Sequence, residues 1–194
     1  MVVGLYVGIA TVGIFAYWYM YDSDAGDGHT LVTFSQLANF SECKTFTDFF
    51  AQSSFGGVTF EVEDIGGVPS YCNYFLGEGK SKACTLSLSV LVTIEMMNAF
   101  NALSENGSLL QVPPSRNWWL ILAVFGSMAQ HCLILYIPFL SAIFGITPLT
   151  WHDWKLVLAF SFPVIIIDEL LKIVSRIKVA KEMQLRLEEK EKEE

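Results

Sequence analysis

Four apolar stretches, each close to 20 residues long, constrain this sequence more than any other feature. They cover residues 2–21, 83–103, 118–137 and 154–173. An α-helix needs about 20 apolar residues to cross the roughly 30 Å hydrocarbon core of a bilayer. We therefore expect an all-α integral membrane protein with four transmembrane helices. The first stretch is interpreted as a membrane helix and not a signal peptide, because no basic stretch precedes it and no small-residue cleavage pattern follows it.

The composition agrees with a membrane protein and excludes two other classes. Apolar residues make up 53% of the chain and charged residues 16%, whereas a soluble domain carries about a quarter charged residues. This balance excludes a soluble enzyme. The net charge of -8 argues against binding to nucleic acid, which requires clustered Lys and Arg. The expected partner is the lipid bilayer.

The distribution of charge predicts how the helices are oriented. The long segment 22–82 carries nine acidic residues against three lysines, whereas the loop 104–117 contains Arg116 and the tail 174–194 is rich in Lys and Arg. Positive charge near membrane ends favours the cytosolic side. Both termini and the loop 104–117 are therefore expected in the cytosol. The segments 22–82, a long and partly ordered loop, and 138–153 are expected on the lumenal side.

Two of the four cysteines, Cys43 and Cys72, fall in the long lumenal loop. An oxidising lumen would allow them to form a disulfide. The residues alone leave two alternatives open, namely two free thiols or a bond from either cysteine to Cys84. Cys132, within the third span, is interpreted as a small core side chain.

The same loop carries two weaker local signals. Asn39 begins the sequence Asn-Phe-Ser, a glycosylation acceptor pattern whose occupancy stays open. Residues 58–64 alternate between apolar and polar types and lie between paired glycines, which predicts a short strand or hairpin.

Glu95 is the residue most indicative of function. It lies within the second span, where a carboxylate costs about 2.5 to 3.5 kcal/mol on insertion scales. Asn98 and Asn101 follow at helical spacing and extend a polar stripe toward the cytosolic end. Carboxylate and amide oxygens suit a hard cation such as calcium, and Asn98 is expected to lie behind Glu95 and to orient it. The alternatives are a proton carrier and a neutral carboxylic acid that is hydrogen-bonded between helices.

Other polar residues in the spans favour structural roles. Asp168 and Glu169 lie near the cytosolic end of the fourth span, and Lys172 follows four residues after Asp168. This spacing predicts an ion pair that anchors the end of the helix. His131, among apolar residues of the third span, is interpreted as a buried hydrogen-bonding group and not as a metal ligand.

Several longer motifs carry a resemblance to a known family. In chain order they are GLYVGIATVG, LSLSVLVTIEMMNAFNALSENGSLL, the pair Pro113 and Pro114, HCLILY, ITPL and PVIIIDELLK. In this order they resemble the C-terminal four membrane helices of a calcium-transporting P-type ATPase of the sarco/endoplasmic reticulum type, particularly its plant members. The resemblance covers nearly the whole chain.

The resemblance implies that the four spans are helices seven to ten of a ten-helix pump. Glu95, in VTIEMMN, matches the calcium-ligating glutamate of helix eight. Cys43 and Cys72 match a lumenal disulfide pair. Gly4 and Gly8, whose spacing permits close helix approach, match glycines that pack against helix five.

The resemblance also implies that the chain is a fragment of an enzyme, since it contains no DKTG phosphorylation sequence, no TGE loop and no nucleotide site. The complete pump would be a translocase that carries calcium from cytosol to lumen and uses ATP and magnesium. Its remaining helices and cytosolic domains would be partners of this chain. The alternative is an independent four-helix membrane protein with a structural or regulatory role.

The end of the tail bears on localisation. Lys190 and Lys192 resemble a dilysine retrieval signal, which requires a cytosolic tail and predicts residence in the endoplasmic reticulum membrane. The alternative is a solvated, charged helix end.

Overall fold

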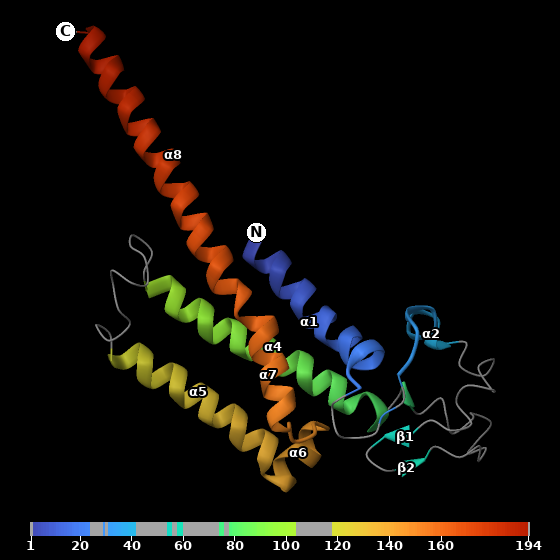
Figure 1. Cartoon of the computed structure of the whole chain (residues 1–194). Helices are drawn as coiled ribbons and strands as arrows, with labels where there is room; N and C mark the ends of the chain where they lie inside the picture. The colour runs from blue at the N-terminus through green and yellow to red at the C-terminus, as the bar shows by residue number, and fades with distance from the viewer. Residues whose placement is uncertain are drawn as a thin grey trace.

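The computed structural model describes residues 2–23, 29, 31–41, 54–55, 58–59, 74–75, 78–103 and 118–193, and most of these residues are helical (Figure 1). The helices are α1 (Val2–Tyr21), α2 (Phe34–Ala38), α4 (Glu78–Leu103), α5 (Trp118–Tyr136), α6 (Pro138–Phe144), α7 (Trp151–Ser161) and α8 (Pro163–Glu193). A short hairpin pairs β1 (Ser54–Phe55) with β2 (Val58–Thr59). It contains the first two residues of the predicted strand 58–64, whose remainder lies outside the described residues.

Three of the described helices are long and apolar enough to cross a membrane. They are Val2–Tyr21, Lys80–Ala102 within α4, and Trp118–Tyr136. The predicted class, an all-α membrane protein, is thereby confirmed. The count of four spans and the extent of the lumenal loop stay predictions.

The fourth predicted span, 154–173, is divided between α7 and α8 at Phe162. Pro163 has no N–H to donate to the carbonyl four residues earlier, so the helical hydrogen-bond ladder is interrupted there. Phe162 nevertheless keeps right-handed helical angles, and its N–H donates to the Leu158 carbonyl at 2.9 Å. The chain therefore continues from α7 into α8 without reversing direction (Figure 1).

Helix α4 is the centre of the bundle, because it contacts α1, α5, α7 and α8. Its residues Leu86, Val90 and Ile94 recur every four positions and are fully buried, which forms one continuous apolar face. The hydroxyl of Ser87 donates to the Thr11 carbonyl of α1 at 2.8 Å. Close packing and this hydrogen bond join the first two spans.

Successive long helices run in alternating directions (Figure 1). The start of α1, the end of α4, the start of α5 and the end of α8 lie toward one end of the bundle, whereas α6 and the start of α7 lie toward the other. The two chain termini therefore lie toward the same end, as the predicted topology requires.

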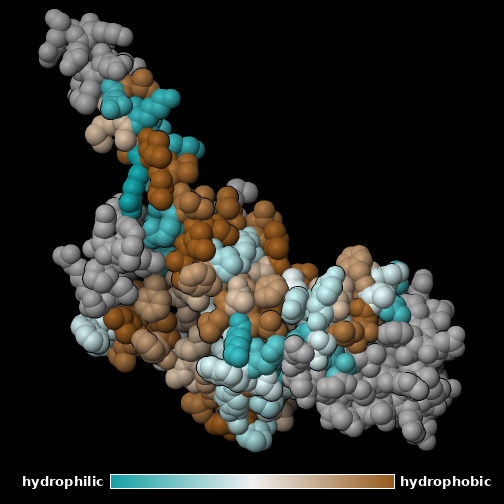
Figure 2. All heavy atoms as spheres, in the orientation of Figure 1, coloured by the Kyte–Doolittle hydropathy of each residue, from teal (hydrophilic) through white to brown (hydrophobic). Residues whose placement is uncertain are grey.

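Large apolar side chains cover much of the surface of the bundle (Figure 2). Leu5, Ile9 and Val12 of α1 are exposed, as are Leu122 and Phe125 of α5. Surfaces of this kind are rare on soluble monomers and mark contacts with lipid or with other protein.

Candidate functional site

Glu95 lies in α4 on a face that points away from the core of this chain. Its neighbours Thr93 and Ile94 are 4% and 0% exposed, whereas the Glu95 side chain is exposed. Adjacent residues of a helix are separated by about 100° around its axis, so Glu95 can be exposed although the residue before it in the sequence is buried. Among the described residues, Glu95 has no hydrogen-bond or ion-pair partner.

The two asparagines that follow Glu95 line a groove at the end of α4. Asn98 is half-buried and Asn101 is 4% exposed. The groove has a volume of about 1030 Å³ and is also lined by Val3 of α1 and by Asp168 and Lys172 of α8. The polar stripe predicted on α4 therefore leads from Glu95 into a groove between three helices whose lining is mainly apolar but includes the polar side chains of Asn98, Asn101, Asp168 and Lys172.

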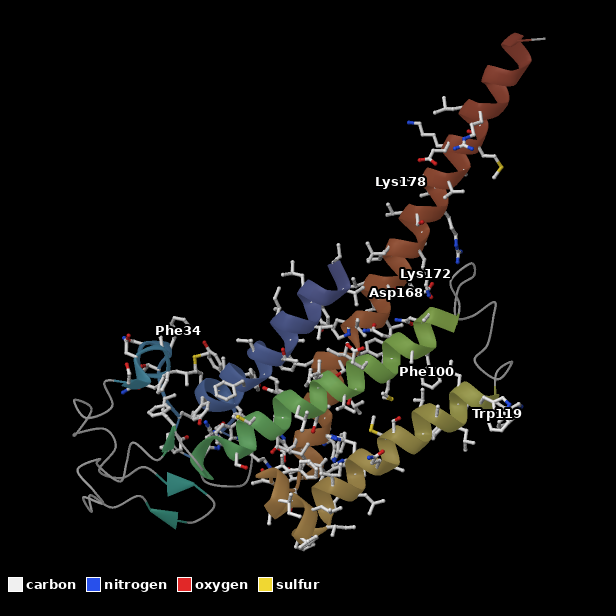
Figure 3. The ribbon with its side chains drawn as sticks, turned by 180° about the vertical axis from the view of Figure 1, so that it is seen from behind. Phe34, Phe100, Trp119, Asp168, Lys172 and Lys178 are labelled. Carbon is white, nitrogen blue, oxygen red and sulfur yellow. The ribbon has the colours of Figure 1, made fainter. Side chains whose placement is uncertain are left out.

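Asp168 and Lys172 form the predicted ion pair, with 2.7 Å between the Lys172 Nζ and Asp168 Oδ2 atoms. The same ammonium donates a hydrogen bond to the Asn101 carbonyl at 2.8 Å and lies 4.0 Å from a carboxylate oxygen of Glu169. Figure 3 shows Asp168 and Lys172 beside the C-terminal turns of α4. The predicted ion pair is confirmed, but it lies within α8, which continues to Glu193, and the helix end that Lys172 contacts is that of α4.

His131 is buried and lies 3.0 Å from the Ser89 hydroxyl of α4, measured at its Nε2 atom. Its ring also meets the edge of the Trp154 ring, with 6.4 Å between centroids. The prediction of a buried hydrogen-bonding histidine is confirmed. In the part of the chain that the structure describes, no three His, Cys, Asp or Glu side chains are grouped to hold a metal ion.

The predicted packing glycines, Gly4 and Gly8, lie on an open face of α1 within the described part of the chain. A Cβ atom added at Gly4 or at Gly8 would have no described heavy atom within 4 Å. A third glycine, Gly13, has the Phe160 ring 3.5 Å from where its Cβ would be. Among these three glycines of α1, the one that packs against a described helix is therefore Gly13, which the spacing pattern missed.

The other predicted sites are only partly described. Cys43 and Cys72 lie outside the described residues, whereas Cys84 and Cys132 are free thiols. Asn39 is exposed at the C-terminal end of α2, where its side chain is accessible. Lys190 and Lys192 belong to the last turns of α8.

Sequence reasoning missed a buried ion pair at the opposite end of the bundle. Lys82 of α4 contacts Asp153 of α7, and their side chains are 6% and 0% exposed. Asp153 also accepts a hydrogen bond from the Thr150 backbone N–H at 2.6 Å, which completes a capping box at the start of α7. The Thr-x-x-Asp spacing was the only sequence signal for this arrangement.

A second polar contact lies near this pair. The His152 ring approaches Asp22, with 2.8 Å between Nε2 and Oδ1, and Asp22 is 3% exposed. This contact joins the end of α1 to the start of α7. The end of the bundle opposite Lys172 is therefore held by polar contacts among α1, α4 and α7.

The chain is similar to known calcium pumps over most of its length. Residues 1–174 match the family described as cation transporting ATPase, C-terminus. The chain is 51% identical over 182 residues to calcium-transporting ATPase 4, endoplasmic reticulum-type, of Arabidopsis thaliana, an alignment that covers 91% of the chain and 17% of that protein. It is 48% identical over 184 residues to a calcium-transporting ATPase of Plasmodium falciparum, with 95% and 14% covered.

A fungal relative agrees with these two. The endoplasmic reticulum calcium ATPase srcA of Aspergillus fumigatus is 41% identical over 176 residues, which cover 91% of the chain and 16% of that protein. The chain thus spans about one sixth of the length of the curated relatives it matches. On these matches, the chain belongs to the family of C-terminal regions of cation-transporting ATPases.

Proposed function

We propose that this chain is the C-terminal transport region of an ATP-driven pump that moves calcium from the cytosol to the lumen of the endoplasmic reticulum. Calcium is the transported substrate. The remaining part of the pump would supply the phosphorylation site, the nucleotide and magnesium sites, and further membrane helices. The observation that carries the proposal is the position of Glu95.

A carboxylate at this position needs a partner beyond the residues that the structure describes. Glu95 lies in the membrane-spanning window Lys80–Ala102, faces away from the buried side of α4, and has no partner among the described residues. Facing lipid, an ionised carboxylate would cost about 2.5 to 3.5 kcal/mol or more. Further helices of the same pump, which enclose Glu95 together with a calcium ion, would offset this cost.

The chemistry of Glu95 suits calcium. Calcium takes six to eight oxygen ligands, and a carboxylate supplies oxygen atoms while it also offsets the charge of the ion. Asn98 lies three residues further along α4 and is half-buried in the groove. We assign Asn98 a supporting role, in which its amide orients the groups around Glu95.

The names of the relatives support the endoplasmic reticulum as the membrane and calcium as the transported ion. All three are called calcium ATPases or calcium-transporting ATPases, and two carry endoplasmic reticulum in their names. The alternating helix directions are compatible with two cytosolic termini, with the acidic segment 22–82 and Asn39 in the lumen. An exposed Asn39 is accessible to glycosylation there.

The test replaces Glu95 in the full-length pump and measures calcium-dependent ATPase activity against free calcium. Glu95→Gln keeps the side-chain shape but removes the charge, so the apparent affinity for calcium should fall while the protein stays folded and inserted. Glu95→Ala should lower the affinity at least as much. Glu169→Gln is the matched control, because it makes the same change in a different helix, α8, within the predicted fourth span, and it should keep wild-type affinity.

Wild-type calcium dependence in Glu95→Gln would show that Glu95 is not a ligand. Glu95 would then be a neutral hydrogen-bonding group between helices. An equal loss of affinity in Glu169→Gln would also contradict the assignment, because it would trace the effect to general perturbation of membrane carboxylates.

A further inference from the structure

The short helix α6 exposes large apolar side chains at the end of the bundle opposite the chain termini. Phe139, Ile143 and Phe144 are 73%, 62% and 61% exposed. Phe139 and Ile143 lie one turn apart and therefore share a face. Phe144 lies off that face at the end of the helix, and a cluster of three exposed apolar side chains marks a contact with lipid or with other protein.

The turn that follows α6 lies alongside the first turns of the candidate span Lys80–Ala102. The Ser81 hydroxyl of α4 donates to the Gly145 carbonyl at 2.8 Å. The Thr147 backbone N–H donates to the Thr85 hydroxyl at 3.1 Å. Ser81 and Thr85 belong to the span Lys80–Ala102, so the connection between α5 and α7 bends back alongside the first turns of that span.

Several backbone groups of this connection have protein partners, which favours a position within the membrane. Helix α6 ends at Gly145, whose φ of 63° is left-handed, and the Ser141 carbonyl accepts hydrogen bonds from the N–H groups of Gly145 and Ile146. This is the hydrogen-bonded helix end that glycine permits. Further along, the Tyr136 hydroxyl donates to the Leu149 carbonyl at 2.8 Å.

The residue types around α6 also suit the bilayer interface. No Asp, Glu, Lys or Arg occurs from residue 117 to residue 152. The Trp154 indole N–H donates to the Tyr136 hydroxyl at 2.8 Å, and Trp and Tyr are enriched at the headgroup layer. These two side chains mark that layer at the end of α5, beside α6.

We propose that α6 and the turn after it, residues 138–149, lie in the interfacial layer of the bilayer, with Phe139, Ile143 and Phe144 in contact with phospholipid. The segment 138–153, expected from the sequence to be a lumenal loop, is then largely a membrane-contacting element that anchors the end of α5 and the start of α7. This inference concerns the opposite end of the bundle from the Asn98 groove and is independent of the role of Glu95.

The test uses the full-length pump in phosphatidylcholine nanodiscs and two photoactivatable probes. One probe is a phosphatidylcholine with a diazirine near the glycerol end of its acyl chain, and the other is a small water-soluble diazirine. Labelled residues are located by mass spectrometry. Phe34 of α2 is the internal control, because it is an equally exposed phenylalanine on a short helix, 70% exposed, in a segment that is expected to be aqueous.

The lipid probe should label Phe139, Ile143 and Phe144 several-fold more than Phe34, and the aqueous probe should show the reverse preference. Aqueous labelling of α6 as strong as that of Phe34 would overturn the proposal. So would protection of α6 from both probes, which would indicate that another part of the pump covers it. The calcium dependence of wild-type ATPase activity is measured separately, so either result leaves the Glu95 assignment to its own test.

A pair of substitutions provides a second test. Phe144→Glu places a charge in the interfacial layer, whereas Phe34→Glu places the same charge in water. Phe144→Glu should therefore reduce the yield of folded pump several-fold relative to Phe34→Glu. Equal yields would contradict contact between α6 and lipid.

Discussion

The ammonium group of Lys172 lies 2.8 Å from the carbonyl oxygen of Asn101 and 2.7 Å from a carboxylate oxygen of Asp168. Asn101 belongs to the last turn of α4, where backbone carbonyls have no partner within the helix. One side chain of α8 therefore caps the end of α4 and neutralises an acid of its own helix. This contact joins α8 to the end of α4, where the polar stripe of α4 enters the groove.

Lys172→Met should destabilise the protein, because it removes both contacts and leaves Asp168 without its ion pair. Hydrogen bonds to charged groups contribute about 1.5 to 3 kcal/mol. We expect a lower midpoint of thermal inactivation for the purified full-length pump. Lys178→Met is the control, because Lys178 is exposed and lies farther along α8 (Figure 3). Equal midpoints for the two variants would contradict the anchoring role.

Asp153→Asn should be the more severe change at the opposite end of the bundle. Asparagine can still accept the hydrogen bond from Thr150, but it leaves the Lys82 ammonium buried without an opposite charge. Loss of one member of a buried pair costs about 3 to 5 kcal/mol. The measurements are the yield of folded protein and its thermal midpoint.

The double variant Lys82→Met with Asp153→Asn tests the cause of that loss. With no buried ammonium remaining, much of the lost stability should return, because an apolar replacement of a buried pair is often tolerated. A double variant less stable than Asp153→Asn alone would show that the packing of the Lys82 side chain against α7, and not the charge pair, stabilises the protein here.

The sequence predicted features that depend on neighbouring residues. Hydropathy located α1 and α5 closely, because the length of an apolar run depends only on the thickness of the bilayer. The pair of Asp168 and Lys172 followed from spacing within one helix. The environment of His131 followed from the apolar residues beside it, although Ser89 as its partner did not.

Contacts between distant segments were not predictable. Lys82 and Asp153 are 71 positions apart, and Asp22 and His152 are 130 positions apart. Both contacts depend on how α1, α4 and α7 pack, which hydropathy does not encode. Helix α6 was missed for a different reason: a seven-residue apolar helix is shorter than a span, and its sequence does not distinguish a lumenal loop from an interfacial segment.

The long lumenal loop is predicted to be oxidised, with a disulfide between Cys43 and Cys72. Both cysteines fall in the segment assigned to the lumen, and Cys84, the alternative partner, is a free thiol in α4. Peptide mapping under non-reducing conditions, on protein made in microsomes, should recover a single cross-linked peptide pair. Recovery of both cysteines as free thiols, or of either joined to Cys84, would contradict this pairing.

The tail is predicted to carry a retrieval signal at Lys190 and Lys192. Such a signal is read by a cytosolic receptor and does not act as an anchor. Substitution of both lysines by serine should allow the full-length pump to reach later compartments, as observed by microscopy and by processing of attached glycans. Substitution of Lys178 and Lys181, which belong to the same helix, controls for loss of charge and should leave the localisation unchanged.

Gly8→Leu should identify which surface of α1 meets the rest of the pump. An added Cβ at Gly8 has no described atom within 4 Å, so this chain alone tolerates a larger side chain. If a further helix packs there, as small residues at this spacing permit, leucine should lower both the yield and the calcium-dependent ATPase activity of the full-length pump. Gly126→Leu is the matched control, because Gly126 lies on α5 and is equally open. Wild-type yield and activity in Gly8→Leu would show that lipid, and not another helix, covers this face of α1.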